Sequence, residues 1–255
     1  MKPLRSFHPA RRHRLGAASV AAMLLLSMCA GVHAAPAVAQ STVNALLEQA
    51  HVRDGATQAI LVTVDAQDGP RARLSTYAYQ SGHWSQVMGP VPAVVGKNGT
   101  SLHKHEGDMK SPAGIFRMGR AFGSKPEPNG VSLPYTRTTR YDYWVDDASS
   151  PDYNRWETWY GDPDQRWKSF ERLRIPAYTY AAVIEYNTDP IRKGAGSAIF
   201  FHIWPGPDGH TAGCTAVSKQ NVLKVLRWLD PARHPVIIQG SAEQLTALAH
   251  GKPRS

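Results

Sequence analysis

The chain has 255 residues, of which 42% are hydrophobic and 19% are charged, which is typical of one large globular domain or two small ones. Its formal net charge is +9, but residues 1–34 hold five of the 29 Lys and Arg residues and none of the 20 Asp and Glu residues. The rest of the chain therefore carries only +4, a mild and dispersed charge that argues against a dedicated nucleic-acid-binding protein.

Residues 1–34 have the order of parts found in a secretion signal peptide. Four arginines precede the apolar stretch 15–30, and Val32-His33-Ala34 has the small-x-small pattern of a cleavage site. The apolar stretch is short for a transmembrane helix. We therefore expect cleavage near Ala34, export, and no stable membrane insertion afterwards. An uncleaved membrane anchor and export by the twin-arginine route are the alternatives.

The first half of the chain reads as a meander of short strands behind a linker and a short helix at 35–58. In chain order, the patterns predict a helix over 42–51, strands over 59–64, 72–79 and 83–87, a polar loop over 102–116, and an aromatic-rich segment over 121–164. The aromatic-rich segment is either a long surface loop or one wall of a substrate cleft.

The second half adds the clearest helix signals. Its patterns predict a strand over 181–187 continuing at 198–203, a helix over 218–229 with Ser218 as N-cap, a closing strand over 235–239, and a helix over 241–250 with Ser241 and Gln244 spaced as a capping box. Composition does not divide the chain after the leader. We therefore expect a single mainly β domain with a few helices over 59–255.

Cys214 is the only cysteine left once the leader is removed, and it lies 12 residues after His202. A lone thiol in an oxidising compartment is either buried and inert or free and reactive. An imidazole at a strand end can deprotonate a thiol on a nearby turn. Gly213 allows a backbone angle that other residues resist, and it leaves main-chain N–H groups near the sulfur open for a developing oxyanion. Thr211 can either hydrogen-bond within the turn or orient a substrate. Together these residues indicate acyl transfer through a thioester.

The arrangement His202, a Gly/Pro loop, and Thr211-Ala212-Gly213-Cys214 resembles the motif of the L,D-transpeptidase catalytic domain (YkuD type). The segments 105–116 and 181–201 are also similar to family segments, so the resemblance covers roughly residues 59–240. It implies a β-sandwich-like fold, a location in the periplasm or cell wall, action on peptidoglycan stem peptides, sensitivity to carbapenems, and no metal or other cofactor. Ala212 stands where many members have a second His, and Ala216 where Arg or Asn is usual.

The polar loop predicted over 102–116 carries charged side chains that suit a stem peptide, because such a peptide has both carboxylates and amines. Lys104, Glu106 and Asp108 present both signs within one loop, and we predict that they bind substrate together with Trp204. The alternative for Asp108 is a turn-capping role through backbone N–H groups.

Other readings of the sequence remain open at this point. The same acyl-enzyme serves an L,D-carboxypeptidase or a D-amino-acid exchange enzyme. A non-catalytic wall-binding module would use Trp144, Trp156 and Trp159 as a platform. A metal-dependent hydrolase would use His103, His105 and His202 as ligands. His210 is a reserve base for Cys214.

Overall fold

The computed structural model describes residues 37–251, so the predicted leader over 1–34 lies outside the described residues. The helices are α1 (Gln40–Asp54), α2 (Lys219–Trp228) and α3 (Ala242–Ala249), with short 3-10 turns η1 (Pro163–Gln165), η2 (Pro176–Tyr178) and η3 (Pro231–Arg233). The strands are β1 (Gln58–Val64), β2 (Arg71–Gln80), β3 (His83–Val94), β4 (Thr100–Ser101), β5 (Ser111–Pro112), β6 (Gly114–Gly123), β7 (Tyr135–Arg137), β8 (Asp142–Val145), β9 (Trp156–Thr158), β10 (Phe170–Arg172), β11 (Ala181–Ile184), β12 (Phe200–Ile203), β13 (Thr215–Val217) and β14 (Val236–Ser241).

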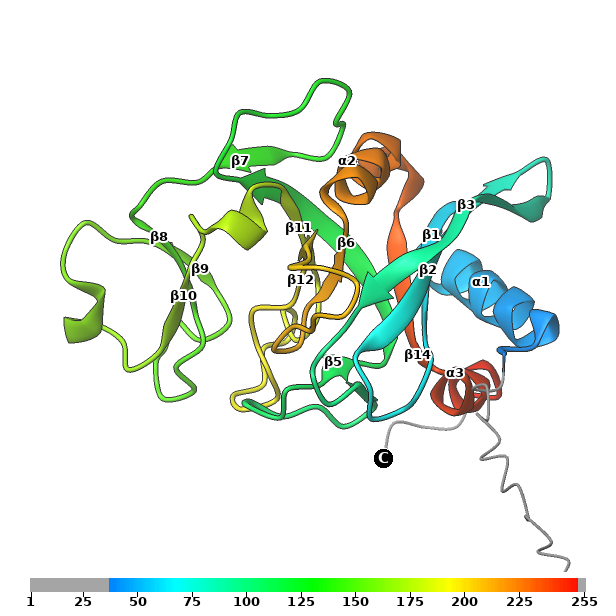
Figure 1. The fold of residues 1–255 in the computed structure, drawn as a ribbon, viewed down its shortest axis with the longest axis horizontal. Coiled ribbons are helices and arrows are strands. Elements are labelled where there is room, and N and C mark those ends of the chain that lie inside the picture. The colour runs from blue at the N-terminus through cyan, green and yellow to red at the C-terminus, as the bar shows by residue number, and fades with distance from the viewer. Residues whose placement is uncertain (1–36, 252–255) are drawn as a thin grey trace, which may run out of the picture. The chain divides into compact units, whose positions relative to one another are not determined.

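Nine strands form one large sheet in the order β11-β12-β13-β3-β2-β1-β14-β6-β7 (Figure 1). β6 also pairs antiparallel with β11, so the sheet closes on itself. This arrangement confirms the predicted mainly β fold with a few helices. The closed sheet brings β11, β12 and β13 side by side, and these are the strands that carry the candidate site.

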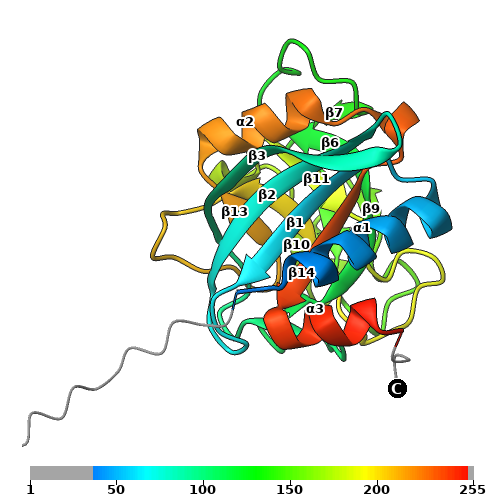
Figure 2. The same cartoon turned by 90° about the vertical axis from the view of Figure 1, so that its right-hand side faces the viewer.

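Strands β1 and β14 are buried on both faces, which explains the apolar runs in their sequences. In β1, Ile60 and Val62 point into the main core with α2, whereas Ala59 and Leu61 face a second core formed with α1 and α3. Figure 2 shows α1 and α3 beside β1 and β14. The helix predicted over 42–51 is thus longer than expected and packs against the sheet.

The two later helices confirm their sequence signals. The Ser218 side chain accepts a hydrogen bond from the Asn221 N–H at 3.3 Å and begins α2. Ser241 and Gln244 form the predicted capping box at the start of α3. The strand predicted over 235–239 is β14, and it lies inside the sheet between β1 and β6.

Two predictions of loop structure were wrong. The polar loop was expected over 102–116, but the ten-residue strand β6 already begins at Gly114. The aromatic-rich segment contains β8 and β9, which join β10 in a separate three-stranded sheet (Figure 1). We call residues 139–180, which contain this small sheet and η2, the cover segment. Some of its aromatic side chains are buried, since Tyr143, Trp144 and Tyr153 are each at most 6% exposed, whereas Tyr160 is 76% exposed.

None of the helices within residues 37–251 is long and apolar enough to cross a membrane.

Candidate active site

The Cys214 thiol is held by the strand next to it. β12 and β13 run parallel with Phe201 opposite Thr215, so Cys214 lies beside Phe200. The Phe200 backbone N–H donates to Cys214 Sγ at 3.3 Å, and the thiol donates to the Ala198 carbonyl oxygen at the same distance. Cys214 is only 5% exposed, and its neighbours in the cluster are mostly apolar. The strand pairing therefore fixes the sulfur in a dry, defined position.

A network of hydroxyl groups shapes the turn before the cysteine. Thr211 Oγ1 donates to the Cys214 carbonyl at 2.7 Å and accepts the Gly213 N–H at 3.1 Å. Ser111, which the sequence did not single out, donates to the same carbonyl at 2.9 Å. Gly213 has a φ of 156°, and a Cβ there would lie 3.1 Å from the Lys110 carbonyl oxygen. The turn thus requires the glycine, and Thr211 organises it as predicted.

His202 lies on the same face of β12 as Phe200, and it is buried. Its Nδ1 is 2.9 Å from the Ile203 carbonyl oxygen. Because a carbonyl only accepts, the ring proton sits on Nδ1 and the lone pair on Nε2. Burial lowers the pKa of His202 to about 4, so the ring is neutral near pH 7. Among residues 37–251, no hydrogen bond joins this ring to the Cys214 sulfur.

Electrostatic effects on the Cys214 thiol oppose one another. Burial raises its pKa above the ordinary value, and the Glu171 carboxylate raises it further. The Phe200 N–H, the Lys104 ammonium and the Tyr178 hydroxyl each favour the thiolate. Burial prevails, so the thiol is neutral at rest and must transfer its proton to a base before or during attack.

Lys104 and Asp108 form a buried ion pair beside the cysteine turn. Lys104 Nζ lies 2.7 Å from Asp108 Oδ1, and the two side chains are only 3% and 6% exposed. A Cβ placed on Gly213 would lie 3.3 Å from Lys104 Nζ, which puts the ammonium against the turn. Burial of Asp108 opposes its ionisation, but hydrogen bonds from Lys104 and from the Lys110 and His105 N–H groups lower its pKa overall.

These contacts favour the turn-capping alternative for Asp108 over direct contact with substrate, and they give it the further task of holding Lys104. Glu106 is likewise engaged within the protein. Its carboxylate accepts hydrogen bonds from the Tyr153 hydroxyl and from Ser197 Oγ, the latter at 2.8 Å. The charged loop therefore acts as an internal support of the site.

Asp108→Ala is expected to lower the free energy of unfolding by about 3–5 kcal/mol, because it leaves the buried Lys104 ammonium without its partner. Lys104→Met should cost clearly less, since Asp108 keeps the backbone N–H groups of His105 and Lys110 as donors. Denaturant unfolding of both variants measures the difference. Equal losses, or no loss in Asp108→Ala, would show that the pair does not stabilise the fold.

The cover segment supplies site residues that the sequence reasoning missed. The Tyr178 hydroxyl donates a hydrogen bond to Glu171 Oε2, and it favours the thiolate form of Cys214. The Tyr178 ring packs edge-on against the His202 ring, with centroids 5.2 Å apart. No local sequence motif indicates this pair. The two residues meet at the site because β10 and η2 pack over β12 and β13.

Asn154 connects the cover segment to the strand that bears the site. Its Oδ1 accepts from Trp144 Nε1 at 2.8 Å and from the Ala198 N–H at 3.2 Å. Its Nδ2 donates to the carbonyl oxygens of Tyr186 and Asn187, at 3.2 and 2.6 Å. One side chain thus binds both ends of the loop that precedes β12. The cover segment therefore packs against the strand that bears the site, and the prediction that it forms one wall of a substrate cleft stays a prediction.

The geometry does not assemble the alternative sites. Trp144 is buried and Trp156 partly buried, while the 38% exposed Trp159 packs its ring under Arg166, so the three do not form one platform. His103 and His105 are exposed whereas His202 is buried. Among residues 37–251, no group of three or more His, Cys, Asp and Glu side chains is placed to bind a metal ion.

The remaining predicted residues lie at the edge of the site. Trp204 directly follows β12, is partly exposed, and pairs its N–H with the Val217 carbonyl oxygen at 2.9 Å. His210 is exposed in the loop before Thr211. Ala216 is fully buried and lies opposite His202 in the sheet, so a larger polar side chain at this position would have no free space.

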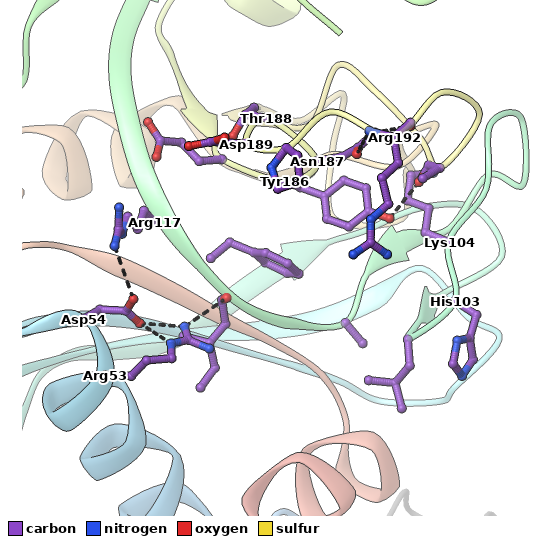
Figure 3. A pocket seen from close by; sticks show the side chains of 17 residues that line it. Arg53, Asp54, His103, Lys104, Arg117, Tyr186, Asn187, Thr188, Asp189 and Arg192 are labelled. Carbon is purple, nitrogen blue, oxygen red and sulfur yellow. Dashed lines mark hydrogen bonds and ion pairs between the residues drawn. The ribbon is translucent and has the colours of Figure 1, made fainter. Parts of the chain in front are cut away.

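A cavity of about 900 Å³ ends at Lys104. Figure 3 shows Arg53, Asp54 and Arg117 towards one end of it and His103, Lys104 and Arg192 towards the other. Positive and negative side chains both line it, a composition that suits a zwitterionic peptide. Lys104 lines this cavity and also contacts the cysteine turn, since its aliphatic stem borders Gly196 and its ammonium borders Gly213.

Comparisons with known proteins identify the family of the chain. No curated protein matches the chain. Among solved structures, the chain is similar to the helical cell shape determining protein Pgp2 from Campylobacter jejuni, with 16% identity and a TM-score of 0.41 over 75% of this chain and 54% of that chain. The chain thus spans about half the length of that protein. The family model of the L,D-transpeptidase catalytic domain (YkuD) matches residues 59–238. The chain therefore belongs to the L,D-transpeptidase catalytic domain family.

Proposed function

We propose that the protein is an exported cysteine acyltransferase that remodels peptidoglycan stem peptides. The observation that carries the proposal is the single thiol of the exported chain, fixed by strand pairing on a family-matched turn with an imidazole on the same face of the sheet. The mixed-charge cavity that ends at Lys104 supports a zwitterionic peptide as substrate. Residues 1–34 would serve as the signal peptide, and residues 59–255 as the catalytic domain.

In the proposed reaction, the Cys214 sulfur attacks the carbonyl carbon of an L,D bond in the stem peptide. Amides of the turn around Gly213 stabilise the oxyanion that develops. The intermediate collapses to a thioester on Cys214 as the D-residue leaves as an amine, which takes up a proton. In the second half, an acceptor amine attacks the thioester and gives up a proton. His202 Nε2, which carries the free lone pair, is the base proposed to accept the thiol proton. The ring then gives this proton to the leaving amine, and the neutral ring accepts the proton of the acceptor amine in the second half.

The acceptor decides which product forms. A second stem peptide gives a crosslink, a free D-amino acid gives exchange, and water gives a trimmed peptide. All three share the Cys214 thioester. We propose transfer to an amine as the main reaction, because it is the activity for which the family is named.

Incubation of the mature protein with purified muropeptides, followed by mass analysis, tests this proposal. We expect a covalent peptide adduct on Cys214 and products of altered mass, either crosslinked, exchanged or trimmed. Unchanged muropeptides in the presence of a Cys214 thiol that small reagents do modify would contradict an enzyme and favour a wall-binding module.

A further inference from the structure

The cavity that Lys104 lines has its charged side chains sorted by sign. Its acidic lining residues are Asp54, Glu185 and Asp189. Asp54 pairs with the Arg117 guanidinium at 3.7 Å, and the Glu185 N–H donates to the Arg117 carbonyl oxygen at 3.0 Å. Figure 3 shows Asp54 and Asp189 on the side of the cavity away from Lys104. The carboxylates are therefore gathered at the far end.

The end that borders the cysteine turn is lined by cations instead. Lys104 lies there, and Arg192, from the loop before β12, lies towards the same end (Figure 3). Asp108, the acidic partner of Lys104, is not one of the lining residues. A ligand at this end therefore meets positive charge, and an anionic group suits it best.

The Lys104 ammonium keeps hydrogen-bonding capacity for such a group. It has three N–H donors, and Asp108 Oδ1 accepts one of them at 2.7 Å. Among residues 37–251, no second acceptor bonds to Nζ. Asp108 also accepts the N–H groups of His105 and Lys110, so its charge is shared among three donors. A buried ammonium with unused donors favours an anion as ligand.

This ammonium lies close to the nucleophile. A Cβ on Gly213, the residue before Cys214, would be 3.3 Å from Lys104 Nζ. A Cβ on Gly196 would be 2.7 Å from Lys104 Cε, and the thiol donates to the Ala198 carbonyl oxygen two residues further on. The ammonium and the sulfur therefore adjoin the same two chain segments.

We propose that Lys104, positioned by Asp108, binds a carboxylate of the substrate beside Cys214 and selects substrates that carry one there. In a stem peptide that ends at the leaving D-residue, the terminal carboxylate lies one residue beyond the attacked carbonyl. An amidated terminus lacks this charge and leaves the ammonium unpaired. The inference rests on the proposed function for the identity of the substrate, and on Lys104, Asp108 and the cavity for the carboxylate.

The test compares iodoacetate with iodoacetamide on the same thiol of the mature full-length protein. In both reactions the Cys214 sulfur displaces iodide, and the reagents differ only in a carboxylate or a carboxamide next to the attacked carbon. Lys104→Met should lower the ratio of the iodoacetate rate to the iodoacetamide rate roughly 10-fold at low ionic strength. Intact mass gives both rates. Changes in thiol ionisation affect both reagents alike, so they do not move this ratio.

Lys110→Met is the matched control. The Lys110 ammonium is also paired with a carboxylate, Asp68 at 2.9 Å, but its side chain does not line this cavity. The variant removes the same charge from the same loop and should keep the wild-type ratio. Melting temperatures confirm folding. If Lys104→Met fails to fold, N-acetylcysteine amide is the reference, and the wild-type protein should show a ratio roughly 10-fold above that of this neutral thiol.

Stem peptides give a second measurement. In the wild type, a peptide that ends in a free D-residue should have a KM roughly 10-fold below that of its C-terminal amide. Lys104→Met should remove the difference by raising the KM of the free acid. A purely structural Lys104 would change the kinetics of both peptides alike.

Failure of the carboxylate site and failure of the proposed function give different results. An unchanged ratio in folded Lys104→Met, or an equal fall in Lys110→Met, overturns the carboxylate site even where muropeptides are converted. A wild-type thiol that neither reagent modifies overturns it too. A ratio that falls only in Lys104→Met, with muropeptides unchanged, supports the carboxylate site and makes the proposed substrate wrong.

Discussion

Cys214→Ser is expected to abolish the covalent adduct that the wild-type protein forms with a carbapenem, the inhibitor class that the family resemblance implies. A serine hydroxyl is a far weaker acid than a thiol, and neither His202 nor Glu171 is a strong enough base to ionise it. The substitution is nearly isosteric, and a hydroxyl can take over both hydrogen bonds of the thiol, to the Phe200 N–H and the Ala198 carbonyl. Intact mass after incubation gives the adduct yield.

The control for this experiment is the melting temperature, which should change little because the two hydrogen bonds are retained. Muropeptide conversion should be lost together with the carbapenem adduct. An adduct of equal yield on Cys214→Ser would place the nucleophile on another side chain and remove the basis for a thioester.

His202→Ala is expected to slow the turnover of muropeptides by about 10²–10⁴-fold, the usual effect of removing a general base. The Nδ1 bond to the Ile203 carbonyl leaves Nε2 as the accepting atom, and alanine has no substitute for it. His210→Ala is the matched control and should retain activity, since that exposed ring has no contact with the sulfur.

The structural alternative for His202 has its own signature. The pKa of His202 falls from 6.5 in the unfolded chain to about 4 in the fold, so folding favours the neutral ring. That contribution is present above pH 6.5 and is lost as the pH falls through 4, by up to about 3 kcal/mol. The stability advantage of the wild type over His202→Ala should therefore shrink on acidification. A folded variant with wild-type turnover would make His202 a core residue only.

Sequence patterns predicted the parts of the fold that local chemistry determines. The Ser218 cap, the Ser241–Gln244 capping box and the apolar run of β1 each depend on neighbouring residues, and each is present. β6 was missed because polar residues precede it and its burial comes from β14 and β11, strands distant in sequence. The cover segment was missed as a sheet because its strands are only three or four residues long.

The same division holds for the site. His202, Thr211, Gly213 and Cys214 lie within 13 residues, and their spacing sufficed to place them together. Lys104 was noticed for its charge, but its position against the turn depends on the fold, as does its pairing with Asp108. Glu171 and Tyr178 lie some 40 residues before Cys214 in a segment that looked like a loop. Only the packing of β10 and η2 on β12 reveals them.

Asn154 determines how the sulfur becomes accessible. Its amide group takes part in four hydrogen bonds, to Trp144, Ala198, Tyr186 and Asn187. Because one side chain makes all four bonds, we expect the cover segment to separate from the loop before β12 in a single step. Exposure of Cys214 would proceed as one cooperative opening. In hydrogen exchange, the Ala198 amide, held by Asn154, and the Phe200 amide, held by Cys214, should then share a single opening free energy and exchange together.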